Sequence, residues 1–436
     1  MQSSPSPLNS PTPAQQHALD LGEFVTASPS SFHAVAEAVR RLTESGFSPL
    51  IETEAWSLNA GKYYVQRDGA VIAFVIPQGA TAATGFRILG SHTDSPSFKL
   101  KPKPTTSSFG WLQAGVEVYG GPLLNSWLDR ELVLAGRIVT HDGTEVLTRT
   151  APLLRFPQLA IHLDRGVNEG LKLDPQRHMN PIWGTGRADE QDLLAVLAKA
   201  AGIDPLTIGG YDVVACDAQA PALFGATSEF LASARLDNLS SVHASLVALQ
   251  SVADESLSQI PMLAAFDHEE IGSASRSGAA GPFLEEVVRR IGFSLGGSTE
   301  DSYRAIADSI CLSSDAGHAI HPNYPERHDP ANQPLAGKGP LLKINANQRY
   351  STDAVSAAAW TQWCAQADAP YQEFVSNNAM PCGSTIGPIT ATRLGIRTLD
   401  VGVPLLSMHS AREMAHVEDL YGLARIAQEF FTHNSK

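Results

Sequence analysis

The stretch Phe86-Arg-Ile-Leu-Gly-Ser-His-Thr-Asp94 joins an apolar strand directly to a histidine and a carboxylate. It follows another apolar run, residues 70–76 (AVIAFVI), which is long enough to form a fully buried strand. Polar residues at the carboxyl ends of such strands line the ligand site of open α/β sheets. His92 and Asp94 are therefore candidate site residues in an α/β fold.

The pattern of predicted helices and strands along the sequence indicates two structural parts. Helical and strand patterns alternate before residue 95 and again from residue 236, as in an α/β domain. Between them, short apolar stretches such as 116–119, 132–134 and 159–161 alternate with Gly, Pro and Asp turns. We therefore expect an α/β domain over 19–95 and 236–436, interrupted by a β-rich insertion over 96–235. Residues 1–18, rich in Ser, Pro and Gln, are expected to be a flexible extension.

The composition argues against several classes of function. The 436 residues include 45 acidic and 31 basic side chains, a net charge of −14, which disfavours binding to nucleic acids and to anionic membranes. The first residues show neither a basic region nor an apolar run, so they do not resemble a secretory signal. The four cysteines are scattered and form no CxxC pair. We expect a cytoplasmic protein.

Five separate segments place carboxylates or imidazoles at predicted strand ends. Two histidines and three carboxylates suit a pair of divalent metal ions with one carboxylate bridging them. Each segment alone is more often structural than metal-binding, but five of them in one α/β domain favour a shared site. The segments are 91–94 (SHTD), 235–238 (RLDN), 266–270 (FDHEE), 313–315 (SSD) and 408–410 (MHS).

The adjacent pair Glu269 and Glu270 suggests a division of labour. Neighbouring side chains on an extended segment point to opposite sides, so one can bind a metal while the other stays free. A free carboxylate beside a metal site is a candidate general base. Asp94, two residues after His92, can orient that imidazole.

From about Leu21 to Phe431 the sequence resembles the aspartyl aminopeptidases, the M18 family of cytosolic zinc metallopeptidases. The order and joint presence of several motifs carry this resemblance. They are 92–96 (HTDSP), 233–238 (SARLDN), 267–273 (DHEEIGS), 315–323 (DAGHAIHPN), 343–347 (KINAN), 382–385 (CGST) and 408–410 (MHS).

The resemblance implies a fold and a ligand set. It implies a mixed-sheet, di-zinc catalytic domain, with the β-rich insertion serving as a dimerisation domain. His92 and Asp315 would complete one metal site, Glu270 and His409 the other, and Asp237 would bridge the two. Glu269 would be the general base and Asp94 would orient His92. Zinc is the expected metal, although sites rich in carboxylates also accept cobalt or manganese.

The resemblance also implies a substrate and an assembly. The family removes N-terminal aspartate, and next glutamate, from peptides, and forms homo-oligomeric dodecamers. Lys343 would meet the substrate carboxylate near Tyr350, while His318, Gly383 and Ser384 would shape the pocket. His162 would complete the active site of a neighbouring subunit.

Some positions have plainer interpretations. Without the resemblance, Lys343 would be taken for an exposed strand lysine. The less favoured alternative for His162 is packing in a subunit interface without touching substrate. The family often has larger residues after the aspartate ligand than Ala316 and Gly317, which leaves the strictness of the acidic preference open.

Two other functions remain open from sequence. The first is a related two-metal amidohydrolase that deacylates N-acyl amino acids. The second is a catalytically silent assembly protein on the same fold. The complete ligand set and the intact Glu269 argue against the second.

Overall fold

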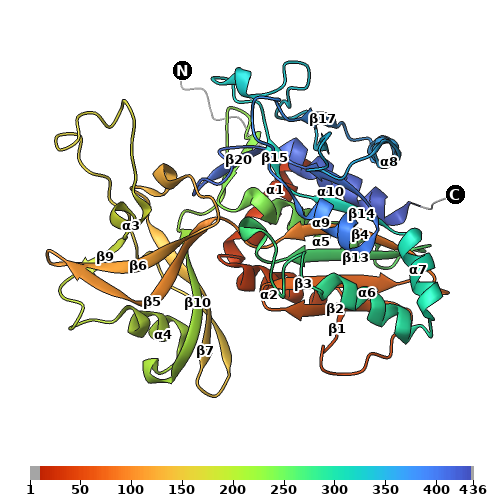
Figure 1. Cartoon of the computed structure of the whole chain (residues 1–436), viewed down its shortest axis with the longest axis horizontal. Coiled ribbons are helices and arrows are strands. Elements are labelled where there is room, and N and C mark those ends of the chain that lie inside the picture. Colours follow the sequence, from red (N-terminus) through yellow and green to blue (C-terminus); the bar gives the residue numbers. More distant parts are fainter. Residues whose placement is uncertain (1–9, 434–436) are drawn as a thin grey trace, which may run out of the picture.

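Two central strands, β3 (Ala70–Ile76) and β4 (Phe86–His92), are buried along their whole length. In the computed structural model, which describes residues 10–433, they belong to a mixed sheet of nine strands (Figure 1). Alternate side chains of β3 enter two different cores, Val71 and Ala73 on one face and Ile72 and Phe74 on the other. This two-residue alternation explains why the run has no polar face.

The nine-stranded sheet has the order β1-β2-β3-β13-β4-β14-β18-β16-β17. Its four central neighbours β13, β4, β14 and β18 run parallel, so their carboxyl ends meet at one edge. The remaining strands are β1 (Ser48–Pro49), β2 (Gly61–Arg67), β13 (Ile260–Phe266), β14 (Ile310–Ser314), β16 (Leu341–Ile344), β17 (Gln372–Val375) and β18 (Arg397–Gly402).

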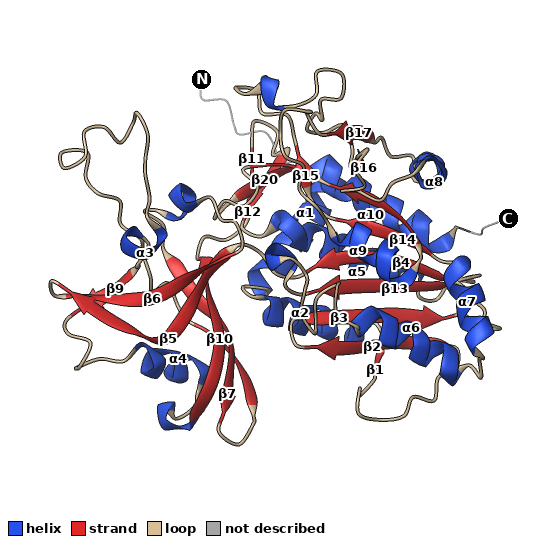
Figure 2. Cartoon of the chain, in the orientation of Figure 1, coloured by secondary structure: helices blue, strands red, loops and turns tan. Residues whose placement is uncertain are grey.

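Helices cover both faces of this sheet (Figure 2). One face packs against α1 (Pro13–Ala27), α2 (Ser31–Glu44), α5 (Leu236–Val252), α8 (Ala354–Gln366) and α10 (Val417–Thr432). The other packs against α6 (Phe283–Ser294), α7 (Thr299–Ala307) and α9 (Ile386–Leu394). We call this sheet, its helices and the rest of the chain outside 97–217 the large lobe.

Residues 97–217 form the small lobe, which is built on an antiparallel sheet of order β8-β7-β10-β5-β6-β9. Its own core contains Phe98, Trp127 and Phe156, and α4 contributes Leu193 and Leu197. The elements are β5 (Ser97–Ser108), β6 (Trp111–Tyr119), β7 (Leu132–Thr140), β8 (Glu145–Arg149), α3 (Pro175–His178), β9 (Ile182–Thr185), α4 (Leu193–Ala201) and β10 (Ile208–Asp217).

A third sheet, of order β11-β12-β20-β19-β15, lies in the large lobe. Its first two strands fall inside the expected insertion of residues 96–235, yet β12 pairs with β20 near the C-terminus. The six-stranded sheet itself ends at Asp217. The strands are β11 (Ala222–Phe224), β12 (Phe230–Ser233), β15 (Gly317–His318), β19 (Pro404–Leu406) and β20 (Glu413–His416).

The predicted α/β architecture with a β-rich insertion is confirmed, but two local expectations are not. Residues 13–18 are helical rather than flexible, because Thr12 and Gln15 form a capping box and Pro13 occupies the first turn. Residues 1–9 of the expected extension lie outside the described residues. The stretch 159–161 is an exposed loop and not a strand.

Among residues 10–433, no helix combines the length and the apolar character needed to cross a bilayer.

A cluster of two histidines and an aspartate joins α1 to α5. The rings of His17 and His243 lie 4.9 Å apart, and His243 Nε2 lies 2.8 Å from Asp20 Oδ2. Burial, with a further contribution from His243, lowers the pKa of His17 from 6.5 to about 3. Burial also lowers the pKa of His243.

These depressed pKa values predict acid sensitivity. Below pH 6.5, His17 binds a proton in the unfolded chain but stays neutral in the folded protein. The free energy of unfolding therefore falls as the pH falls from 6.5 towards 3. We expect His17→Gln to reduce the loss of Tm between about pH 7.5 and about pH 5.5. Leu19→Gln, on an exposed position of the same helix, changes no titratable group and should lose as much Tm as the wild type. An equal loss in His17→Gln would contradict the assignment.

Candidate metal and active site

The five predicted metal ligands come together at the edge where the parallel strands end. His92 is the last residue of β4 and pairs in register with Phe266, the last residue of β13. Glu270 follows β13 in a short 3₁₀ turn, and Asp315 follows β14. Asp237, in the first turn of α5, and His409, beyond β19, approach the same edge. The bond between Asp237 and Asn238 is cis.

The side chains form two overlapping groups. His92 Nε2 lies 3.3 Å from Asp237 Oδ1 and 3.6 Å from Asp315 Oδ1. His409 Nε2 lies 3.4 Å from Asp237 Oδ2 and 3.4 Å from Glu270 Oε2. Within each group the potential ligand atoms are all within 4.8 Å of one another. Asp237 belongs to both groups and presents one oxygen to each.

The chemistry of these atoms fits a cation. Within the described residues, Asp237 Oδ1 and Glu270 Oε1 are buried without a hydrogen-bond partner. Burial and the charge of Asp237 raise the pKa of Glu270 well above its ordinary value. Although burial alone would lower the pKa of His92, the carboxylates of Asp237 and Asp315 beside its Nε2 raise that pKa well above the usual range. Mixed imidazole and carboxylate ligands suit zinc.

Glu269 lies beside both groups, but the segment does not have the extended conformation expected from sequence. The segment is not extended, because His268 adopts a left-handed conformation and Glu269–Ile271 form a 3₁₀ turn. Glu269 nevertheless presents an oxygen within 4.8 Å of ligand atoms of His92 and Glu270. Burial, and the negative charges of Asp315 and Asp237, raise the pKa of Glu269 to about 8. A nearby cation would favour its ionised form.

Asp94 organises this turn more than it orients His92. Its Oδ1 accepts a hydrogen bond from Glu269 N at 3.0 Å, and its Oδ2 accepts one from Glu270 N at 3.2 Å. The nearest acceptor for His92 Nδ1 is the main-chain oxygen of Asp94 at 3.0 Å, whereas the carboxylate is at 3.4 Å. Asp94 therefore fixes both glutamates as well as the imidazole.

Glu413 is a site residue that the sequence did not reveal. It is buried, and its two oxygens accept hydrogen bonds from Asp237 N at 2.9 Å and from His409 N at 2.8 Å. Burial and the charge of Asp237 raise its pKa to about 8. The only signal available was a carboxylate four residues after His409, a spacing that is common elsewhere.

The residues predicted to contact substrate differ in burial and in position. Lys343 is only 2% exposed, so it is not an ordinary surface lysine; its Nζ donates to Ala316 O at 2.8 Å and lies 5.4 Å from the centre of the buried Tyr350 ring. His318 lies on β15, the strand that follows Asp315. Gly383 and Ser384 lie in an exposed loop before α9.

His162 is not part of the cluster in its own chain. It lies on the exposed loop 157–174, which projects from the small lobe away from the nine-stranded sheet (Figure 1, olive). Any contact with an active site would therefore have to involve another subunit.

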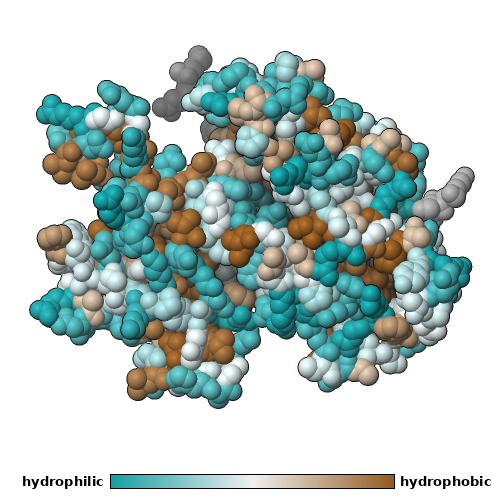
Figure 3. Space-filling model, in the orientation of Figure 1, coloured by the Kyte–Doolittle hydropathy of each residue, from teal (hydrophilic) through white to brown (hydrophobic). Residues whose placement is uncertain are grey.

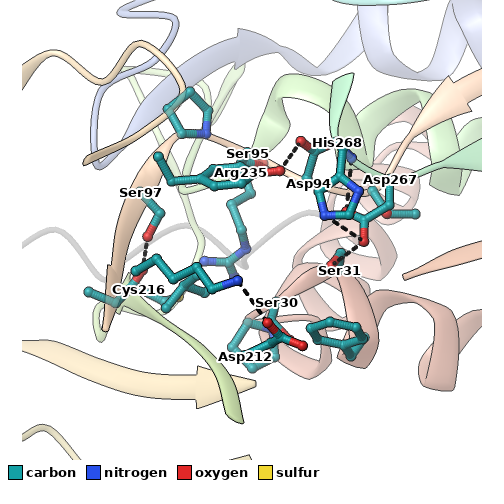
Figure 4. Close-up of a pocket in the computed structure, with 18 of the residues that line it drawn as sticks. Ser30, Ser31, Asp94, Ser95, Ser97, Asp212, Cys216, Arg235, Asp267 and His268 are labelled. Carbon is teal, nitrogen blue, oxygen red and sulfur yellow. Dashed lines mark hydrogen bonds and ion pairs between the residues drawn. The ribbon is translucent and has the colours of Figure 1, made fainter. Parts of the chain in front are cut away.

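A cavity of about 250 Å³ lies between the two lobes, next to Asp94 (Figure 4). It is lined by Asp94 and Asp267 from the large lobe and by Ser97, Asp212 and Cys216 from the small lobe.

Comparison with known proteins identifies the family. The family model described as "Aminopeptidase I zinc metalloprotease (M18)" matches residues 24–431. The chain belongs to the M18 family of aminopeptidases. The predicted membership of the M18 family is thereby confirmed, and the chain is an M18 metalloaminopeptidase.

Relatives of this M18 aminopeptidase match over nearly the full length. A probable M18 family aminopeptidase 2 of Streptomyces avermitilis is 54% identical and covers 94% of this chain and 96% of its own. A counterpart in Mycobacterium tuberculosis is 41% identical, covering 94% and 97%.

Solved structures agree with this M18 fold. A chain in the cryo-EM structure of the Ape4 and Nbr1 complex superposes with a TM-score of 0.93 at 37% identity, covering 96% of this chain and 86% of that one. The Saccharomyces cerevisiae mApe1 dodecamer gives a TM-score of 0.84 at 28% identity, covering 95% and 96%.

The position of Glu413 yields a test of the site. In Glu413→Gln the amide nitrogen would face a backbone N–H, so one of the two hydrogen bonds to the Asp237 and His409 main chains is lost. We expect zinc affinity to fall about 10-fold to 100-fold, measured by competition with a chelator. The exposed Glu418→Gln should bind zinc like the wild type. Equal affinities in all three proteins would remove Glu413 from the site.

Proposed function

We propose that this M18 aminopeptidase removes N-terminal aspartate, and less readily glutamate, from peptides, using two divalent metal ions that are zinc in the first instance. The observation that carries the proposal is the position of Asp237, which presents one oxygen to each ligand group. His92 and Asp315 would hold one ion, and Glu270 and His409 the other. Cobalt or manganese could replace zinc at such a site.

Each neighbouring residue then has a role in hydrolysis. Bound zinc supplies Lewis acidity, which polarises the scissile carbonyl and lowers the pKa of a water molecule. Glu269, fixed through its main chain by Asp94, takes the proton from the attacking water and delivers it to the leaving amine. Both proton transfers need a carboxylate that lies close to the metals without being one of their ligands.

Lys343 supports the preference for acidic residues. It is a buried cation beside Tyr350 in an otherwise acidic chain. A substrate side-chain carboxylate would pair with its ammonium, whereas a neutral side chain would gain no such pairing. His318, Gly383 and Ser384 are proposed to complete the pocket wall.

We also propose a homo-oligomer, dodecameric like the matched mApe1 structure, in the cytoplasm. Loop 157–174 exposes Leu159, Ile161 and Leu163, the last of them 75% exposed. Figure 3 shows apolar side chains gathered on this projecting loop. Burial of such side chains favours association with a partner. His162, among them, is proposed to reach a neighbouring active site and stabilise the oxyanion of the tetrahedral intermediate.

A kinetic panel tests the reaction and the base together. One peptide scaffold is presented with N-terminal Asp, Glu, Ala, Leu or Lys, alongside N-acetyl-aspartate. We expect hydrolysis of the Asp peptide first and Glu next, no deacylation, and loss of activity after chelation with recovery on adding zinc. Glu269→Gln should lower kcat by about 100-fold or more while its zinc content stays unchanged. Activity that survives thorough chelation, or turnover retained in Glu269→Gln, would refute the mechanism.

Deacylation of N-acetyl-aspartate with no peptide hydrolysis would instead favour the amidohydrolase. A zinc-loaded protein inactive on every substrate would favour an assembly protein.

Mixed oligomers test the proposed role of His162. His162→Ala and Glu269→Gln should each be nearly inactive alone. Co-expressed, a His162→Ala subunit keeps its base and can receive His162 from a Glu269→Gln neighbour, so part of the activity should return. A mixture as inactive as its components would show that His162 does not act across subunits. His141→Ala, on an exposed turn of the small lobe, is the matched control and should remain active.

A further inference from the structure

Residues 119–126 of the small lobe contact the large lobe next to two proposed metal ligands, His409 and Glu270. The segment starts at the end of β6 and enters a 3₁₀ turn at Leu124–Trp127. Four hydrogen bonds join it to the large lobe: Tyr119 Oη to Asp94 Oδ2 at 2.7 Å, His409 Nδ1 to Gly121 O at 3.0 Å, Leu123 N to His409 O at 2.8 Å, and Ala411 N to Ser126 Oγ at 2.9 Å.

The bond to Gly121 determines which nitrogen of His409 is free. A carbonyl oxygen only accepts hydrogen bonds, so Nδ1 must carry the proton. Nε2 is then the nitrogen that faces Asp237 and Glu270 and that would bind a metal through its lone pair. Partners of this kind raise the ligand strength of a histidine and set its orientation.

Gly120 brings the same segment against the second ligand of that site. Its φ is +68°, a conformation that favours glycine, and a Cβ placed there would lie 3.1 Å from Glu270 Cβ. The backbone of the small lobe thus lies directly over Glu270.

Packing holds one end of this contact, because Ala411 is only 2% exposed and belongs to the core of the small lobe. The cavity of about 250 Å³ opens between the lobes next to Asp94 and Tyr119, so apolar side chains do not fill this part of the boundary (Figure 4). Loss of the bond between Tyr119 and Asp94 is therefore not compensated by apolar packing on the side of the cavity.

We infer that residues 119–126 are a positioning segment, through which the small lobe holds His409 and Asp94 in the geometry that metal binding requires. Zinc affinity then depends on the contact between this segment and the large lobe. The inference rests on the proposed metal site. Because coupling is reciprocal, bound metal should in turn stabilise the seating of the small lobe.

The test compares two tyrosine variants of the full-length protein. Tyr119→Phe removes the bond to Asp94, whereas Tyr211→Phe removes a 2.7 Å bond to Lys101 O within the small lobe. We expect about a 10-fold faster release of zinc to a chromogenic chelator, and an altered visible spectrum of the cobalt-loaded protein, in Tyr119→Phe only. Ser126→Ala, which removes the acceptor for Ala411 N, should also release zinc faster.

Hydrogen exchange tests the reciprocal effect on the wild type. Removal of metal should speed exchange of the Leu123 and Ala411 amides but not of the Val213 amide, which lies in the ladder between β10 and β7. Unchanged zinc release in both Tyr119→Phe and Ser126→Ala would overturn the inference. So would equal acceleration in Tyr211→Phe, which would indicate general loosening of the small lobe. A wild type that binds no divalent metal would instead overturn the proposed function, and this inference with it.

Discussion

Mutual repulsion among buried carboxylates is the constraint around which the site is built. Asp237, Glu270 and Asp315 converge with Glu269 at one edge of a sheet, where little water screens their charges. Such a set is stable only if protons or cations neutralise it. Two further buried carboxylates fix the main chain around this set: Asp94 accepts hydrogen bonds from the amides of Glu269 and Glu270, and Glu413 accepts them from the amides of Asp237 and His409. The protein prepares a place for positive charge before any substrate arrives.

Much of the fold could be predicted from sequence because its central strands are buried on both faces. Runs such as 70–76 and 86–90 have no polar alternation, and a run of that length has few other structures open to it. Three of the five predicted ligands, His92, Glu270 and Asp315, could be brought together on the same ground, since polar residues that follow such runs lie at one edge of a parallel sheet. Strand ends are local in sequence and convergent in space.

What the sequence did not reveal depends on contacts between distant segments. Glu413 and Tyr119 look like ordinary residues until folding brings them to Asp237 and Asp94. The 3₁₀ turn at Glu269 follows from the left-handed conformation of His268, a residue type that adopts it only occasionally. The start of α1 could have been predicted, because Thr12, Pro13 and Gln15 provide a capping box and a proline in the first turn.

The insertion of the small lobe also affects how the chain must fold. The neighbours of β4 in the sheet are β13 and β14, and both follow the small lobe in the sequence. During synthesis this apolar strand therefore leaves the ribosome with both edges open, and it stays unpaired until the whole small lobe has been made. Such non-local pairing makes folding slow. The strand that delivers His92 is thus also the segment most in need of protection from aggregation in the nascent chain.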